Sequence, residues 1–325
     1  MFALKALLTL LTASTFNIQA VDRQDVQDCH SAAYERRIAA CTLIAQAQNA
    51  QPQARAYALS ERGAARLDRR DLDGALADYA EAIRIAPDYA YSYYRRGRSY
   101  QLVSHFEESV ADFDAAIRLD PKNALFISLR GLSYHLAGDR AHAMADFEQA
   151  IQLNPKMADA YLYRGHLYLG EDDNDRAIAD LTEAIRLEPT ERRSYADRAE
   201  AYQRKGQHDL AIADLTELVR LDPRSYVVLE ARASSYREKG ELDLAIADLT
   251  EAIRLEPSLI GLYHSRGIAY RLKGDREHAI ADFREVIRIA PLASGAALSE
   301  LRALGADAPK SEREAFKQGV LDLLK

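Results

Sequence analysis

Apolar and small residues recur along most of the chain at helical spacing, in pairs of stretches separated by a short polar break. In one pair, Tyr195, Ala199 and Tyr202 follow the i, i+4, i+7 pattern of a single helix face. A break at residues 205–207 separates them from a second stripe, which ends just before Pro223. Because glycine suits a helix C-terminus and the residue before proline leaves the helical region, the pattern predicts two antiparallel helices.

This helix pair repeats every 34 residues. Seven prolines mark the period: Pro87, Pro121, Pro155, Pro189, Pro223, Pro257 and Pro291. A tyrosine column has the same period: Tyr100, Tyr134, Tyr168, Tyr202, Tyr236 and Tyr270. Three residues before it stands a small residue: Gly63, Gly97, Gly131, Gly165, Ala199, Ala233 and Gly267. A bulky column lies in the second helix: Tyr79, Phe113, Phe147, Leu181, Leu215, Leu249 and Phe283. Since one helix pair cannot bury its apolar faces alone, the repeats are expected to stack on one another.

These columns resemble the tetratricopeptide repeat pattern. The resemblance covers seven repeats over residues 56–293: 56–89, 90–123, 124–157, 158–191, 192–225, 226–259 and 260–293. It implies an all-α fold, a right-handed superhelical α-solenoid of antiparallel helix pairs with terminal capping helices. The sequence departs from the family in two columns. Tyrosine, leucine or isoleucine stands where the family usually has tryptophan, and arginine replaces the leucine before the glycine.

Two charged columns are invariant across the repeats. The first helices carry Arg62, Arg96, Arg130, Arg164, Arg198, Arg232 and Arg266. The second helices carry Asp78, Asp112, Asp146, Asp180, Asp214, Asp248 and Asp282. Because arginine forms bidentate pairs with carboxylates, we expect an ion-pair ladder that sets the register of the stack. A ligand-binding row of arginines is the alternative, and the pattern leaves open whether each pair lies within one repeat or between two.

The ends of the chain depart from the repeat. Residues 21–55 predict degenerate N-terminal capping helices, with Cys41 in the bulky column and Cys29 on a short helix before it. One continuous helix would hold these cysteines about 18 Å apart, so a disulfide requires a turn between them. Two inert buried thiols are the alternative. Residues 294–325 predict C-terminal capping helices, the last opened by a capping box at 311–314. This last helix could instead dock a partner.

The first twenty residues predict a secretory signal peptide that is cleaved after Ala20. Lys5 precedes a short apolar stretch, and small residues precede the expected cleavage site. The stretch is too short for a membrane span, and a buried core helix is the less favoured alternative. We therefore expect an exported protein of a bacterial periplasm, where a disulfide between the cysteines is favoured.

Composition narrows the possible functions. The net charge is −7, so no basic field attracts nucleic acid, and two cysteines are too few for a disulfide scaffold or a four-cysteine zinc site. No P-loop, nucleophile elbow or zinc-protease motif occurs. The acidic run 171–175 lacks the glycine and final glutamate of a calcium loop. His135 and His166 could share a metal, but no third ligand is evident. We expect no catalytic residue, metal or cofactor, and therefore no enzyme.

Tetratricopeptide repeat arrays present their first helices on a concave groove that holds peptides or partner helices. The resemblance implies groove positions at Tyr91, Tyr94, Arg95, Arg98, Leu125, Leu132, His135, Leu162 and His166. Charged residues follow further along: Arg193, Glu200, Arg204, Glu230, Arg237 and Glu238. Ordinary solvent-facing positions are the alternative for each of these. The clamp of chaperone-binding relatives is not matched, because its columns hold residues such as Ser60, Ala64, Tyr94 and Arg98.

The sequence as a whole predicts a non-enzymatic protein–protein interaction scaffold of the cell envelope. The expected partner is a protein or peptide, bound without nucleic acid, cofactor or a membrane span. An accessory subunit of a cell-envelope enzyme or assembly complex is the alternative. A nucleic-acid-binding repeat protein is disfavoured by the acidic charge.

Overall fold

The structure is a computed structural model that describes residues 23–31, 33–291 and 294–306, and all regular structure in these ranges is helical. The signal peptide predicted for residues 1–20 and the capping box at 311–314 lie outside the described residues. The helices are α2 (Arg23–Ser31), α3 (Tyr34–Gln46), α4 (Pro52–Asp68), α5 (Leu72–Ile85), α6 (Ala90–Leu102), α7 (Phe106–Leu119), α8 (Ala124–Leu136), α9 (Arg140–Leu153), α10 (Ala158–Gly170), α11 (Asn174–Leu187), α12 (Arg192–Arg204), α13 (His208–Leu221), α14 (Tyr226–Glu238), α15 (Leu242–Leu255), α16 (Ile260–Lys273), α17 (Arg276–Ile289) and α18 (Gly295–Ala303).

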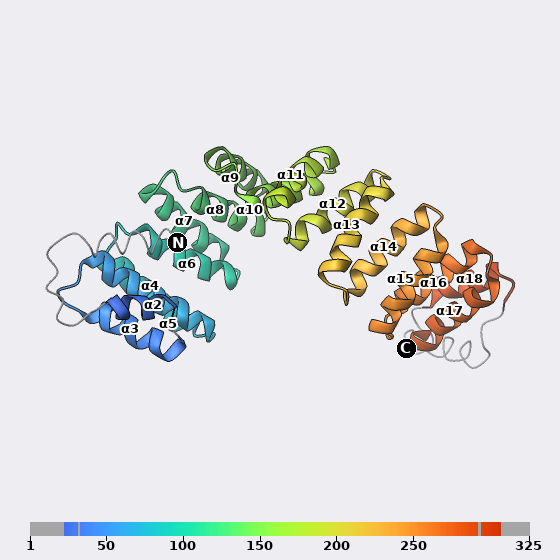
Figure 1. Ribbon diagram of the computed structural model, residues 1–325, viewed down its shortest axis with the longest axis horizontal. Coiled ribbons are helices and arrows are strands. Elements are labelled where there is room, and N and C mark those ends of the chain that lie inside the picture. The colour runs from blue at the N-terminus through green and yellow to red at the C-terminus, as the bar shows by residue number, and fades with distance from the viewer. Residues whose placement is uncertain (1–22, 32, 292–293, 307–325) are drawn as a thin grey trace, which may run out of the picture. The chain divides into compact units, whose positions relative to one another are not determined.

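The chain divides into two compact halves, an N-terminal half of residues 1–163 and a C-terminal half of residues 164–325. Within each half, helices that follow one another in the sequence pack against one another, as the order of colours in Figure 1 shows. The predicted all-α repeat solenoid is confirmed.

Each turn from a first to a second helix contains one residue with left-handed backbone, and these residues also recur every 34 positions. Glycine occupies four of these places: Gly138, Gly206, Gly240 and Gly274. The other three are Arg70, Ser104 and Asp172, with φ of 64°, 61° and 58°. Glycine adopts this conformation without the steric cost that a side chain adds, so these three turns carry local strain.

The two helices of a repeat meet at the small column of the first and the bulky column of the second. A β-carbon added to Gly97 would lie 3.2 Å from the Phe113 ring. In the two repeats with alanine in the small column, Ala199 and Ala233, the bulky residue is a leucine rather than an aromatic ring. The fit is therefore set pair by pair.

The ion-pair ladder exists, and each pair lies within one repeat. In every repeat the arginine Nε and Nη2 donate to both oxygens of the aspartate sixteen residues later. The aspartates are buried, with exposed fractions from 3% at Asp78 to 8% at Asp248. In at least five repeats Nη1 also reaches back to a side chain of the preceding helix pair. These bonds are Arg62 to Thr42, Arg130 to Asp114, Arg198 to Thr182, Arg232 to Thr216 and Arg266 to Thr250. The ladder thus joins neighbouring repeats as well as the helices within one.

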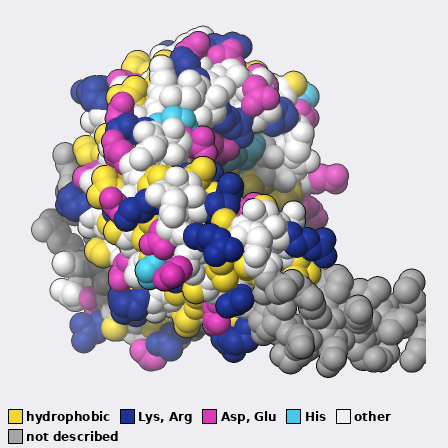
Figure 2. Space-filling view, turned by 90° about the vertical axis from the view of Figure 1, so that its right-hand side faces the viewer, with side chains coloured by type: hydrophobic (Ala, Val, Ile, Leu, Met, Phe, Trp, Pro, Cys, Tyr) yellow, Lys and Arg dark blue, Asp and Glu magenta, His cyan; other side chains and the backbone are white. Residues whose placement is uncertain are grey.

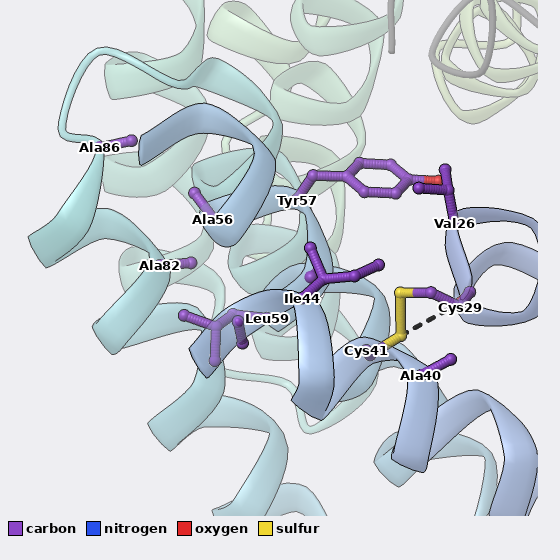
Figure 3. Close-up of a cluster of buried hydrophobic side chains, with 12 residues drawn as sticks. Val26, Cys29, Ala40, Cys41, Ile44, Ala56, Tyr57, Leu59, Ala82 and Ala86 are labelled. Carbon is purple, nitrogen blue, oxygen red and sulfur yellow. Dashed lines mark hydrogen bonds between the residues drawn. A yellow bond between two sulfur atoms is a disulfide. The ribbon is translucent and has the colours of Figure 1, made fainter. Parts of the chain in front are cut away.

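A disulfide fastens the first helix pair. Cys29 on α2 and Cys41 on α3 are bonded, with Cα atoms 4.7 Å apart and both side chains fully buried. The two cysteines lie on separate helices, as the bond requires. Thr42 follows Cys41 as Thr182 follows Leu181, and both threonines accept from a ladder arginine. Cys41 therefore stands in the bulky column, and Figure 3 shows the disulfide beside Ile44 and Val26 in a core that reaches Tyr57.

The helices at the two ends of the repeat array differ from, or add to, the predicted repeat boundaries. α4 begins at Pro52, four residues before the expected start of the first repeat, because proline is well tolerated at the first position of a helix. At the other end, α18 buries Ala297 and Leu301 in a cluster with Phe283 and Ile287 of α17. This contact covers the last apolar face of the described repeats.

Candidate functional site

The first-helix face of the N-terminal half begins with a buried charged cluster around Glu61 of α4. The side chain of Glu61 is 1% exposed. Its Oε2 accepts from Arg37 Nη2 at 2.7 Å, and its Oε1 accepts from Arg95 Nη2 at 2.7 Å and from the Tyr91 hydroxyl at 2.6 Å. The Nε of Arg95 in turn donates to the Tyr91 hydroxyl at 2.7 Å. Tyr91 and Arg95 are therefore occupied inside the protein.

The electrostatics of this cluster keep Glu61 ionised. Burial alone would raise the pKa of Glu61, but Arg95, the Tyr91 hydroxyl and Arg37 outweigh it and hold the pKa below its usual range. Burial, together with the nearby Glu61 carboxylate, raises the pKa of Tyr91, so Tyr91 remains a neutral donor. Removing any one partner would leave a buried charge poorly compensated.

Aromatic rings continue from this cluster along the same face. Tyr57 and Tyr91 are stacked with ring centroids 5.9 Å apart, Tyr91 and Tyr94 are 5.6 Å apart, and Tyr94 and Phe126 are 5.5 Å apart. Tyr57 is 1% exposed, while Tyr94 is half-buried. The side chain of Tyr94, a predicted groove residue, therefore packs between Tyr91 and Phe126 and is only partly accessible to a ligand.

Beyond the aromatic rings, the face opens into a pocket of about 320 Å³ formed by α6, α8 and α10. We call it the leucine pocket; it is lined by Arg98, Gln101, Leu102, Leu125, Ser128, Leu129, Leu132, Leu136, Asp159 and Tyr163. Three of its leucines are among the exposed large apolar residues of the chain: Leu102 at 70%, Leu125 at 39% and Leu136 at 48%. Leucines are exposed elsewhere too, as Leu119 and Leu153 are at 41% and 40%, but here three exposed leucines line one pocket.

The floor of the leucine pocket is held rigid by hydrogen bonds. The Gln101 amide nitrogen donates to the Leu129 carbonyl and to the Ser133 hydroxyl, both at 2.9 Å. The Ser133 hydroxyl also lies 2.9 Å from that of Ser109 on α7. These bonds tie α6, α7 and α8 together, so the leucines sit on a preformed surface.

The structure places the predicted groove residues in several different environments. Arg98, Leu125 and Leu132 are brought together in the leucine pocket. Leu162 is wrong as a groove residue, because it is buried at 4% exposure and packs inside the stack. His166 lies in the other half of the chain, where its Nδ1 is 3.0 Å from the Asp197 carboxylate. His135 is half-buried on α8 and does not line the pocket.

Pattern reasoning missed Leu102, Leu129, Leu136 and Tyr163. A signal was available for α8, because Leu125, Leu129, Leu132 and Leu136 follow i, i+4, i+7, i+11 on one helix face. That stripe is distinct from the stripe through Ile127 and Gly131 that faces the core. Leu129 of this stripe is buried, but the exposed ends of the stripe, Leu125 and Leu136, line the pocket instead of the core.

The corresponding face of the C-terminal half is more charged, although Val227 and Leu272, at the repeat positions of Leu125 and Leu102, are exposed at 56% and 52%. Where α6 ends in Leu102, α12 ends in Arg204, and where α8 ends in Leu136, α14 ends in Glu238. Arg204 is bonded to Glu200 at 2.6 Å and to the Leu169 carbonyl at 2.7 Å, and Arg237 to Glu238 at 3.0 Å. Exposed ion pairs of this kind contribute little to the free energy of unfolding. Figure 2 shows basic and acidic side chains intermingled on one face of the molecule.

Sequence and structure comparisons agree with this architecture. Models described as tetratricopeptide repeat match residues 94–158, 130–192, 162–226 and 260–291, and a further TPR repeat model matches residues 233–274. The chain is a tetratricopeptide repeat protein. No curated protein matches its sequence.

Solved structures similar to this tetratricopeptide repeat protein show the same fold. One is YrrB, described as a TPR protein with an unusual peptide-binding site, at 20% identity and a TM-score of 0.55, covering 58% of this chain and 97% of YrrB. A second, from Parabacteroides merdae, has 21% identity and a TM-score of 0.53, covering 77% of this chain and 98% of its own. The C-terminal part of a TPR repeat-containing protein from Cytophaga hutchinsonii has 16% identity and a TM-score of 0.61, and the match covers 74% of this chain and 98% of that chain.

Other pockets lie in the C-terminal half, one of about 420 Å³ and one of about 100 Å³, and both are lined mostly by polar residues instead of leucines. Within the described ranges, no group of three or more histidine, cysteine, aspartate or glutamate side chains could hold a metal ion. Over the same ranges, no helix is both long and apolar enough to cross a membrane. The leucine pocket is the candidate functional site.

Proposed function

We propose that this tetratricopeptide repeat protein is a scaffold that binds a segment of a partner protein in the leucine pocket, without catalysis. The observation that carries the proposal is the second apolar stripe of α8, whose end residues Leu125 and Leu136 are exposed on a rigid surface. Soluble proteins rarely keep a contiguous apolar patch in water unless a partner covers it. YrrB, which has the same fold, is described as binding peptide, and this supports the same use of the fold here.

We further propose that the protein works outside the cytoplasm, in the cell envelope of a bacterium. The first twenty residues support this location, since they have the charge and apolar pattern of a signal peptide. The buried Cys29–Cys41 disulfide supports it independently, because such bonds persist in oxidising compartments. N-terminal sequencing of the protein from fractionated cells tests the proposal, and a chain beginning at Met1 in the cytosolic fraction would contradict it.

The binding proposal is tested by a matched pair of double variants. Leu102→Gln with Leu136→Gln removes apolar surface from the pocket, while Leu119→Gln with Leu153→Gln removes it from α7 and α9, away from the pocket. All four leucines are the last residue of their helices, so the change in helix propensity is equivalent. Affinity capture from extracts of the native cells, quantified by mass spectrometry, should lose partners with the pocket variant only. Equal capture by both variants would reject the pocket.

A further inference from the structure

We infer that the occupant of the leucine pocket is an amphipathic α-helical segment of a partner protein, which presents a carboxylate to Arg98. This inference rests on the proposed function and adds the shape and charge of the ligand. Its two parts, the helix and the carboxylate, come from separate observations.

The helical shape follows from the geometry of the leucine stripe. The stripe runs along the axis of α8 from Leu125 to Leu136, a rise of about 16 Å over three turns. A partner helix repeats its own side chains about every 5.4 Å, so its ridge can interlock with leucines spaced by the same turn. One face of an extended chain repeats about every 6.7 Å and would fall out of step with the stripe over this length.

The walls of the pocket suit a helix as well. Leu102 projects from α6 on one side of the stripe, and Tyr163 lies on α10 on the other. Leu102 is the most exposed large apolar residue of the described chain, at 70%. A helix lying along α8 would contact both walls and would bury Leu102, which none of the described residues covers. Helix-in-groove recognition uses apolar anchors at this spacing.

The carboxylate follows from Arg98. The two preceding arginines of α6 are paired, Arg95 with Glu61 and Arg96 with Asp112. Arg98, by contrast, is exposed at the rim of the pocket and has no ion pair with any described residue. A guanidinium is weakly hydrated and matches a carboxylate bidentately, so an aspartate or glutamate of the ligand complements it. The acidic lining residue, Asp159, lies on α10 and would repel a carboxylate. The ligand carboxylate is therefore expected on the opposite side of the pocket, beside α6.

The experiment is a selection of random peptides of about 16 residues, long enough to span the stripe as a helix, displayed against the purified full-length protein. We expect the recovered peptides to carry apolar residues at helical spacing with aspartate or glutamate beside them, and to bind the variant with Leu102→Gln and Leu136→Gln much more weakly. Circular dichroism of the complex should show the bound peptide gaining helix, and a proline in its middle should abolish binding.

Charge variants test the role of Arg98. Arg98→Glu should weaken the selected peptides about tenfold or more, while Arg98→Lys should have a smaller effect. Arg118→Glu, the same change at an exposed arginine of α7, is the control and should leave affinity within about twofold. Unchanged thermal unfolding of each variant shows that the fold is intact.

The outcomes separate this inference from the proposed function. Peptides that need the leucines but carry no acidic residue, ignore Arg98→Glu or tolerate the central proline would overturn the inference and leave the pocket as a binding site. A second copy of the chain as occupant, seen as a dimer that the leucine variants dissociate, would also overturn it. If every recovered peptide binds the leucine variants as well as the wild type, both the inference and the proposed function fail.

Discussion

The ring of Phe283 lies directly against the Cα of Gly267. A β-carbon added at Gly267 would be 2.8 Å from ring atom Cε1, and its three nearest neighbours would all be atoms of this ring. In the preceding repeat, Ala233 has its β-carbon opposite Leu249 instead. An aromatic ring in the bulky column always faces a glycine, whereas a leucine faces glycine at Gly165 and alanine at Ala199 and Ala233.

This coupling predicts a non-additive pair of substitutions. Gly267→Ala should lower the free energy of unfolding by about 1–3 kcal/mol, because the Phe283 ring has to shift in a packed interior. Combined with Phe283→Leu, which recreates the Ala233–Leu249 pair, it should cost less than the sum of the two single changes. Urea denaturation of the four proteins of the cycle measures the coupling.

Gly261→Ala is the control for this cycle, since it makes the same change in the same helix α16. A β-carbon at Gly261 meets nothing within 4 Å, so this variant should be neutral or stabilised by up to about 1 kcal/mol. If the effects of the two substitutions add within about 0.5 kcal/mol, the Phe283 ring is not the reason why position 267 holds a glycine.

The left-handed turn residues predict changes of opposite sign at equivalent positions. Ser104→Gly should raise the free energy of unfolding by about 1 kcal/mol, because it relieves a side chain held at φ 61°. Gly240→Ala should lower it by a similar amount, since it introduces that strain at φ 80° where no neighbour lies within 4 Å. Chemical denaturation measures both. Two changes of the same sign would mean that side-chain contacts, not backbone conformation, govern these turns.

The sequence was sufficient to predict the features that repeat. The 34-residue period placed the helix pairs, and the invariant columns predicted the ladder between residues such as Arg130 and Asp146. The repeat pattern could not predict contacts that occur in only one repeat. The repeat pattern predicts Tyr91 and Arg95 as groove residues, because their partner Glu61 lies some thirty residues earlier and carries no residue type that recurs in the repeats. Leu162 was misplaced because a helix drifts relative to any fixed stripe, so a small error in angle separates a buried side chain from an exposed one.

The Glu61 cluster predicts a stability that depends on pH. The pKa of Glu61 is held below the ordinary 4.5, so its ionised form stabilises the folded state above that pH, and the stabilisation is lost as pH falls through the lower folded pKa. Glu61→Gln should therefore cost about 3 kcal/mol at neutral pH and progressively less below pH 4.5. Hydrogen exchange of α4 and α6 across this range measures the difference.

Glu148→Gln on the exposed face of α9 is the control for this titration and should change stability little at any pH. A cost of Glu61→Gln that stays constant into the acid range would show that the amide fails for reasons of shape rather than charge.

The disulfide predicts a stability that depends on redox conditions and is confined to the first helix pair. It closes a loop with a sequence separation of 12 residues, for which the chain-entropy model gives about 3 kcal/mol. Replacing both cysteines by alanine should therefore speed hydrogen exchange in α2 and α3 while leaving α16 and α17 unchanged. A reductant should produce the same effect in the wild type and none in the variant. Faster exchange throughout the chain would instead mean that the first helix pair controls the unfolding of the whole stack.

The backward reach of the ladder arginines gives the array a polarity. Several first helices donate a hydrogen bond to the helix pair before them, as Arg266 Nη1 does to the Thr250 hydroxyl. Among the ladder bonds, deleting repeats from the C-terminal side leaves an acceptor such as the Thr250 hydroxyl open to water, while deleting them from the N-terminal side deprives a donor such as Arg266 Nη1 of its partner. A deletion at either end also uncovers an apolar face, so the ladder makes the two ends of the array differ in their hydrogen bonding and not in their need for a cap.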